Sequence, residues 1–306
     1  MKGGIILFAL AIVAVVLIAE GIYVSNFITK TSVLQIAVRE TDIIESVNLM
    51  EFIKNSMQQA LDYSFYQASY DVARKGGYDK LTIGSYNCAP YWRYYTSTID
   101  FPTNPLDNLS SATKDKLNQY ASALSYDISI MPTYNDVSIV NSGDIIKVSA
   151  IASKKLGIRR VNFYSISDNG NFSSEYQMKF FDLFQRGKAN FIDSDGIESV
   201  VQQAIAEAGS SSADAITQKV NEKLDSLESS LSDSLVEVKI TDRNIEVDTS
   251  KPAVAVRVLI SITDNSEKYP VYDGTTDFRF IKLNFYIVTS SDTSYNPIIL
   301  LTNQCS

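Results

Sequence analysis

The chain of 306 residues carries a net charge of −8 with an isoelectric point near 4.7, and 45% of its residues are hydrophobic. This hydrophobic content supports folded cores, and the acidic balance argues against nucleic acid or an anionic lipid surface as a partner. Because the chain contains no histidine, catalytic triads and histidine metal sites are excluded. No glycine-rich phosphate-binding motif is present, so we predict that the protein is not an enzyme and holds no cofactor or metal.

The first 28 residues form the most informative pattern in the chain. Fifteen apolar residues run without a break from Ile5 to Ala19, and apolar character continues beyond Glu20 to Ile28. A helix needs about 20 mostly apolar residues to cross a bilayer, so we predict a membrane anchor over residues 1–28. The anchor residues expected to contact lipid or other copies of the chain are Ile5, Phe8, Ile12, Val16 and Glu20.

The residues before the apolar run carry a resemblance to a known family. Lys2-Gly3-Gly4 followed directly by an apolar helix resembles the N-terminus of type IV pilins and archaeal pilin-like proteins over residues 1–30. The resemblance implies a leader cut on the cytoplasmic side and an apolar helix that bundles with its copies in a filament. Cutting after Gly3 or Gly4 places Phe8 or Ala9 where many bacterial pilins carry an acidic residue, a departure that archaeal members share.

Two other interpretations of this segment stay open. The first is a retained single-pass anchor. The second is a cleaved secretory signal, which is disfavoured because Leu17-Ile18-Ala19 places leucine where a signal peptidase prefers a small residue.

Residues 29–77 are predicted to form a long amphipathic helix, a stalk whose second half packs on the body. Apolar residues recur at helical spacing from Val33 to Val72, and Gly76-Gly77 supplies a stop signal. The anchor and this helix are expected to run on continuously or to break at Glu40-Thr41-Asp42. At such a break Asp42 and Glu45 would form a capping box.

Residues 78–170 are predicted to form a first α/β module that opens with an irregular aromatic loop. The loop contains Tyr91, Trp92, Tyr94 and Tyr95. Exposed aromatic residues of this kind contact glycans or protein partners. The favoured interpretation is that they cover the core, because tyrosine and tryptophan are readily buried with one polar end satisfied.

Two stretches share the order of a helix followed by antiparallel strands, which predicts two related modules in an α+β fold. In the first, a helix over 110–126 precedes strands over 136–140, 145–152 and 158–167. In the second, residues 171–306 hold connecting helices, a helix over 213–231 and strands over 235–240, 245–247, 253–262 and 278–289. The matching letters that favour a duplication are Val161–Tyr164 with Leu283–Tyr286 and Ile146–Ser149 with Val256–Leu259.

Two further features concern covalent chemistry. Cys88 and Cys305 are far apart in loop-like sequence, and outside the cytosol we expect them to form a disulfide; two unrelated thiols are the alternative. Asn108 and Asn171 begin N-x-Ser patterns that fit N-glycosylation on an extracellular body.

Together these patterns favour a membrane-anchored cell-surface protein with an extracellular body and a structural or adhesive role. In its sharpest form this hypothesis is a pilin-like filament subunit, a homo-oligomer assembled through the N-terminal apolar helix. A ligand-binding sensor ectodomain is the alternative, because a membrane helix, a long helix and two tandem α/β modules resemble double-Cache sensory domains. A viral surface protein would have the same physical features and is the second alternative.

Overall fold

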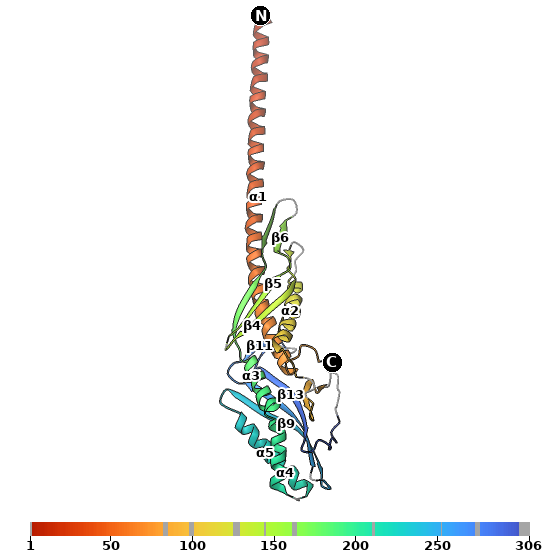
Figure 1. Ribbon diagram of the computed structural model, residues 1–306. Coiled ribbons are helices and arrows are strands. Elements are labelled where there is room, and N and C mark those ends of the chain that lie inside the picture. Colours follow the sequence, from red (N-terminus) through yellow and green to blue (C-terminus); the bar gives the residue numbers. More distant parts are fainter. Residues whose placement is uncertain are drawn as a thin grey trace.

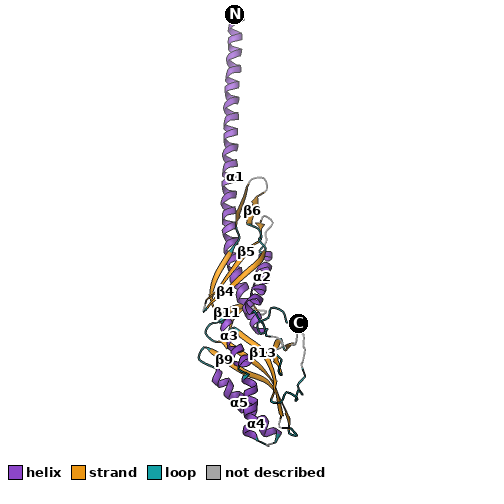
Figure 2. Ribbon diagram, viewed as in Figure 1, coloured by secondary structure: helices purple, strands orange, loops and turns teal. Residues whose placement is uncertain are grey.

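A computed structural model describes residues 2–81, 85–97, 101–124, 129–143, 145–160, 164–209, 212–251, 253–272 and 276–299. Side chains are not described for residues 2–16, 34, 160, 164 and 276. The described chain is an α+β structure in which one very long helix carries an elongated body at its C-terminal half (Figure 1). Of the four sheets in the described chain, the one that contains β4 (Tyr134–Ser142) and β5 (Ile145–Ala152) lies nearer the N-terminal end of that helix than the five-stranded sheet that contains β9 (Val236–Asp248) and β13 (Lys282–Ser290) (Figure 2).

The long helix is α1 (Lys2–Arg74), and it runs without interruption through the predicted break at Glu40–Asp42. The predicted capping box is therefore wrong. The polar side chains bond to the helix backbone instead, as the hydroxyl of Thr41 does by donating to the carbonyl of Ala37 at 3.0 Å. No proline or glycine interrupts residues 22–75, so the helix propensity of the turns on both sides outweighs the short polar stretch Glu40–Asp42.

The predicted glycine stop is confirmed. Gly76 and Gly77 have φ of +60° and +95°, the left-handed region that glycine enters without a Cβ clash. Their N–H groups donate to Ala73 at 2.9 Å and to Val72 at 2.8 Å, which satisfies carbonyls that the end of the helix leaves open. The chain then turns sharply into the body.

The first module packs against the second half of α1. Its helix α2 (Pro105–Ala123) lies alongside α1 and covers strand β4. The antiparallel sheet has the order β4-β5-β8, with β4 (Tyr134–Ser142), β5 (Ile145–Ala152) and β8 (Phe172–Gln177). A second small sheet has the order β3-β6-β7, with β3 (Ser129–Ile130), β6 (Leu156–Arg160) and β7 (Tyr164–Asp168).

The second module is built on a five-stranded sheet of order β1-β2-β13-β10-β9. Its strands are β1 (Ser85–Tyr86), β2 (Ala89–Tyr94), β9 (Val236–Asp248), β10 (Ala253–Asp264) and β13 (Lys282–Ser290). A separate hairpin pairs β11 (Tyr269–Tyr272) with β12 (Thr276–Arg279) and contacts α1. The associated helices are α3 (Phe180–Lys188), the π-helical turn η1 (Ala189–Asp193), α4 (Gly196–Ala208) and α5 (Ala213–Leu231).

The two modules share one topology. Each has a helix, a two-stranded hairpin, an inserted second hairpin and a return strand that pairs with the second strand of the first hairpin. The elements of the first are α2, β4-β5, β6-β7 and β8, and those of the second are α5, β9-β10, β11-β12 and β13. The predicted repeat of a helix with antiparallel strands therefore corresponds to a repeated arrangement in the described chain.

Only one of the two letter matches agrees with this arrangement. Ile146–Ser149 and Val256–Leu259 both lie in the strand that pairs with the return strand, β5 in the first module and β10 in the second. The other match is wrong, because Leu283–Tyr286 lies in the return strand β13 whereas Tyr164 begins β7 of the inserted hairpin. The inserted hairpins displace the return strands along the sequence, so equal letters fall on unequal elements.

Several predicted strands have different bounds. The strand expected over 158–167 is divided between the paired strands β6 and β7, and the one expected over 278–289 is divided between β12 and β13. The strands expected over 235–240 and 245–247 are one long strand, β9, which continues across an irregularity in its pairing with β10 near Arg257. The helix predicted over 110–126 is α2, which begins earlier, at Pro105, because proline is favoured in the first turn of a helix.

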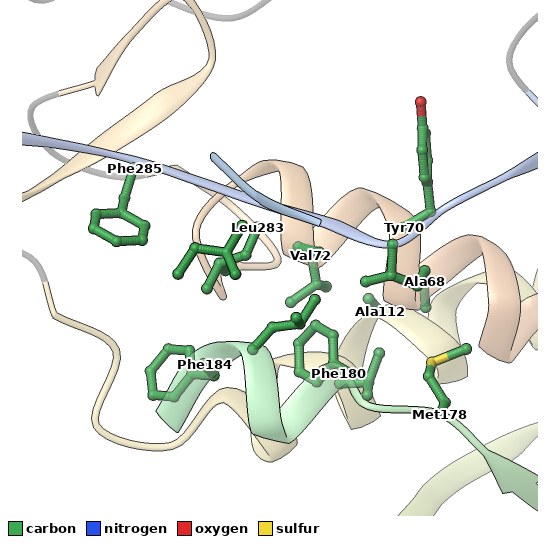
Figure 3. Close-up of a cluster of buried hydrophobic side chains, with 14 of the residues drawn as sticks. Ala68, Tyr70, Val72, Ala112, Met178, Phe180, Phe184, Leu283 and Phe285 are labelled. Carbon is green, nitrogen blue, oxygen red and sulfur yellow. The ribbon is translucent and has the colours of Figure 1, made fainter. Parts of the chain in front are cut away.

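The main core lies where the end of α1 meets both modules. Figure 3 shows Val72 of α1 beside Phe180 and Phe184 of α3 and Leu283 of β13. Nearly all residues of β10 and β13 are buried, and successive residues point to opposite faces of the sheet. One face packs in the main core against the helices, and the other packs in a second cluster that contains Tyr91, Tyr286 and Ile298. Both faces of the central strands are therefore covered, which accounts for the nearly continuous apolar sequence of β10.

Candidate functional site

The N-terminal part of α1 projects beyond the body (Figure 1). All described side chains of residues 17–45 are exposed except that of Asp42, which is half-buried, whereas regular burial begins at Ser46. At 1.5 Å per residue, the projecting helix of residues 2–45 is about 65 Å long. In folded proteins most helical stability comes from packing of one face of the helix, whereas the described side chains of this part are almost all exposed.

The projecting helix is apolar around its whole circumference over residues 17–28. Seven large apolar side chains there are exposed by 52–73%, namely Leu17, Ile18, Ile22, Tyr23, Val24, Phe27 and Ile28. Successive residues are about 100° apart around a helix, so these side chains point in all directions. A helix that is apolar on every side is normally enclosed by other helices or by lipid.

Closer to the body one exposed apolar stripe is formed by Val33, Ile36, Ile43 and Val47, while Val38 is exposed on the opposite side of the helix. The stripe continues at spacings of three and four into the face that the body buries, beginning with Met50 and Ile53. The apolar face of α1 is thus longer than the body that covers it. The N-terminal part of this face is available to another molecule.

The predicted membrane anchor covers residues 1–28, and the structure describes its side chains from Leu17 onward. Among the residues whose side chains are described, no helix is long and apolar enough to cross a membrane. The side chains of Ile5, Phe8, Ile12 and Val16 lie outside that part of the chain. Glu20 is described and lies exposed on the projecting helix.

The aromatic residues of the loop lie inside the body, as the favoured interpretation expected. Tyr91 and Trp92 are completely buried, because the loop contains strand β2 and this strand joins the sheet beside β13. Trp92 stacks on Phe285 at 3.7 Å between ring centroids and donates its indole N–H to the carbonyl of Gly76 at 3.0 Å. In this fold neither residue is accessible to a glycan or a protein partner.

Tyr94 and Tyr95 hold a segment from the far end of the chain. Both hydroxyls donate to the carbonyl of Ile298, at 2.9 and 3.0 Å, and the N–H of Ile298 donates back to the Tyr95 hydroxyl at 2.8 Å. Ile298 itself is buried in the second cluster. The two tyrosines therefore attach residues near 298 to the sheet, a role that their sequence spacing of more than 200 residues did not suggest.

This attachment is expected to weaken at alkaline pH. Burial raises the pKa of Tyr95 from 10 to about 12, because the folded state favours the neutral phenol. A raised pKa means that the stabilisation is complete below pH 10 and is lost as the pH rises toward 12. Burial also raises the pKa of Tyr134 and Tyr286, so the stability of the whole body should fall in the same direction.

Limited proteolysis across pH 9–12, followed by mass spectrometry, measures release of the segment near Ile298, and tyrosinate absorbance measures the titration. The variant Tyr95→Phe loses both the bond from Ile298 N–H and the bond to the Ile298 carbonyl, each worth about 1 kcal/mol, and should make the segment easier to cleave already at pH 9. Equal protection of this segment at pH 9 and pH 12 in the unmodified chain would contradict the assignment.

The two glycosylation candidates have different surroundings. Asn108 lies in helix α2 and donates its side-chain N–H to the carbonyl of Gly77 at 2.9 Å. Asn171 is exposed just before β8, where its side-chain oxygen accepts from the N–H of Ala152 at 2.9 Å. Asn171 is therefore the more accessible of the two acceptors, and glycosylation of either stays a prediction.

Cys88 lies in the turn between β1 and β2 with φ of +66°, and the described part of the chain contains no free cysteine. Cys305 lies outside the described residues. Ile298, near that end of the sequence, packs in the same buried cluster as Ala89, the residue that follows Cys88. This proximity agrees with the expected disulfide. The pairing stays a prediction.

Within the described residues, no group of three or more cysteine and acidic side chains is arranged to hold a metal ion. Of the charged residues on the projecting helix, the sequence pattern singled out Glu20 alone, although Lys30 and Glu40, each ten residues further on, could have been indicated by their spacing. Comparison of the chain with known protein families, curated proteins and solved structures finds no match. The candidate site is therefore identified from the exposure, apolar character and charge of the residues on the projecting helix.

Proposed function

We propose that the protein is a structural subunit that assembles with copies of itself through the projecting half of α1. The observation that carries this proposal is the band of seven exposed apolar side chains at residues 17–28, which lack contacts with the body. Burying each contributes roughly 1.5–3 kcal/mol, so enclosing the band contributes on the order of 10 kcal/mol per helix. This is enough to offset the entropy lost on association by the lower estimates of that cost.

The pilin-like arrangement gives this proposal its concrete form. In it, the apolar run from Ile5 to Ala19 holds the unassembled chain in a membrane, the body lies outside the cell, and helices of many copies bundle in a filament. The support is the combination of the Lys2-Gly3-Gly4 start, the unbroken helix and the body packed on its second half. Intact-mass analysis of the native protein tests the leader, since cleavage after Gly3 or Gly4 is expected.

The test of assembly uses the full-length chain purified in detergent, with removal of detergent followed by sedimentation and negative-stain microscopy. We expect filaments or large oligomers. The variant Phe27→Glu places an unpaired carboxylate inside the apolar band, which costs several kcal/mol. Since 1.4 kcal/mol is a factor of ten, it should raise the concentration needed for assembly by much more than tenfold.

Phe52→Glu is the matched control. Phe52 lies on the same helix and is 52% exposed, against 62% for Phe27, but it lies beside the body. This variant should assemble like the unmodified chain, and both variants should melt like it. A full-length chain that stays monomeric without detergent, or equal effects of the two substitutions, would contradict the proposal.

A ligand-binding sensor ectodomain is the second candidate function, and the repeated α/β topology of the two modules favours it. In that case a ligand binds the folded body and raises its melting temperature. The test measures the melting temperature of the Phe27→Glu variant with each member of a library of small metabolites. This variant keeps the body and weakens assembly, so a rise in its melting temperature reports ligand binding separately from assembly.

A further inference from the structure

Charged residues are sparse on the projecting helix before Val38, and Arg39, Glu40, Asp42 and Glu45 follow closely after it. Glu20 and Lys30 are the two charged residues between Gly3 and Val38, and Glu40 follows ten residues after Lys30. Glu20, Lys30 and Glu40 therefore alternate in sign at an interval of ten residues, with Arg39 beside the last of them. All three side chains are exposed.

These charges are too far apart to pair within one chain. Ten residues of helix span about 15 Å, whereas an ion pair requires an N–O distance of about 4 Å or less. Among the described residues no ion pair or hydrogen bond involves the side chain of Glu20, Lys30 or Glu40. Any partner for them must come from another molecule.

Two of the charges lie within apolar surface. Glu20 is three residues after Leu17 and four before Val24, inside the apolar band. Glu40 is four residues after Ile36 and three before Ile43, so it lies on the exposed stripe. If copies of the helix cover these surfaces, both carboxylates are removed from water, and an unpaired buried charge opposes assembly strongly.

Two simple alignments of neighbouring helices bring unfavourable residues together. Parallel helices without an offset bring Glu20 against Glu20. Antiparallel helices centred at residue 25 pair Glu20 with Lys30, but they place the apolar run of residues 5–19 against residues 31–45. That segment carries the charged residues Arg39, Glu40, Asp42 and Glu45, which would lose water against an apolar surface.

A parallel alignment offset by ten residues avoids both conflicts. It places Glu20 of one copy opposite Lys30 of the next, and Lys30 of the first opposite Glu40 of the next. The run of residues 5–19 then lies along residues 15–29, which are also mainly apolar. Residues ten apart differ by about 80° around the helix, so both pairs can flank one line of contact, as charges flank the seam of a coiled coil.

We propose that neighbouring copies of this chain pack their first helices in parallel with an axial offset of ten residues, about 15 Å, set by the ion pairs Glu20–Lys30 and Lys30–Glu40. The occupant of the exposed helix face is thus a second copy of the chain. This inference rests on the proposed self-assembly and adds its register. The apolar band supplies the attraction, and the charges select one alignment.

Charge reversal tests the pairing in the full-length chain. Glu20→Lys alone and Lys30→Glu alone should each raise the concentration needed for assembly at least tenfold. The triple variant Glu20→Lys, Lys30→Glu and Glu40→Lys restores opposite signs at every pair and should assemble within about threefold of the unmodified chain, a difference of about 0.6 kcal/mol. A triple variant as defective as the single ones would overturn the register.

Disulfide cross-linking measures the offset directly. Chains with Tyr23→Cys are mixed with differently tagged chains carrying Val33→Cys, which keeps all three charges, and the mixture is assembled and oxidised before peptide mapping identifies the linked residues. A link between positions 23 and 33 is expected, and the matched mixture of Tyr23→Cys with Ile28→Cys, five residues away, should yield at least tenfold less. Assembly with a stronger 23–28 link refutes the offset alone, whereas absence of any assembly by the unmodified chain refutes the proposed function and the offset together.

Discussion

Replacing Trp92 with alanine is expected to lower the free energy of unfolding by about 3–5 kcal/mol. The indole is completely buried, stacks on Phe285 with an interplanar angle of 7°, and meets Phe184 at 5.2 Å between centroids. Its N–H also donates to Gly76 at the end of α1. Alanine leaves a large cavity and an unsatisfied carbonyl at the point where the long helix joins the sheet.

Urea unfolding followed by far-ultraviolet circular dichroism measures this loss, because Trp92 is the one tryptophan of the chain and its fluorescence disappears with it. Trp92→Phe keeps part of the packing, so its stability should fall between that of Trp92→Ala and that of the unmodified chain. Tyr63→Ala is the control on the same body, since Tyr63 is 48% exposed and its removal should cost no more than about 0.5 kcal/mol. A loss below about 1 kcal/mol for Trp92→Ala, far under the range for a buried aromatic residue, would show that this contact does not hold the junction.

Replacing Gly76 with alanine is expected to destabilise the same junction through the backbone. With φ of +60°, an added Cβ costs about 1–2 kcal/mol in the left-handed conformation. The same atom would lie 2.5 Å from Cγ of Pro90 and 2.9 Å from the carbonyl oxygen of Asn284. Overpacking of this kind costs about 1–3 kcal/mol more, because two separate elements of the sheet must move.

Gly143→Ala separates the two contributions. Gly143 has φ of +73° in the turn between β4 and β5, and no atom lies within 4 Å of its added Cβ. Its substitution therefore measures the conformational cost alone, by the same urea titration. The difference between the two alanine variants should be at least about 1 kcal/mol, and equal losses would mean that the close approach of Pro90 to α1 is not required for stability.

Local periodicity was sufficient for much of the secondary structure. Helix α5 spans 213–231 and strand β5 spans 145–152, as their patterns predicted, because each has one buried face and recognisable ends. Errors arose where chain reversals interrupt an apolar run, as between β12 and β13, since an apolar run does not show where the chain turns back. The break expected at Glu40–Asp42 failed because local capping signals do not outweigh a helix continuous on both sides.

The candidate site was predictable in position but not in geometry. The apolar run and Glu20 point to the first helix from residue type and spacing alone. The sequence did not show that the helix leaves the body near Ser46, because the apolar stripe has the same spacing on both sides of that point. Only the extent of the body shows that Val33, Ile36 and Ile43 remain uncovered.

By itself the sequence determined the long helix, its glycine stop, the alternation of helices and antiparallel strands, and the absence of histidine chemistry, because these depend on residue type and spacing within short windows. Only the tertiary structure decided that β2 lies parallel to β13, that Trp92 is buried, and that Tyr94 and Tyr95 bind Ile298. These contacts join residues up to 204 positions apart. Such pairs are selected by packing and by satisfaction of buried polar groups, for which a local pattern carries no signal.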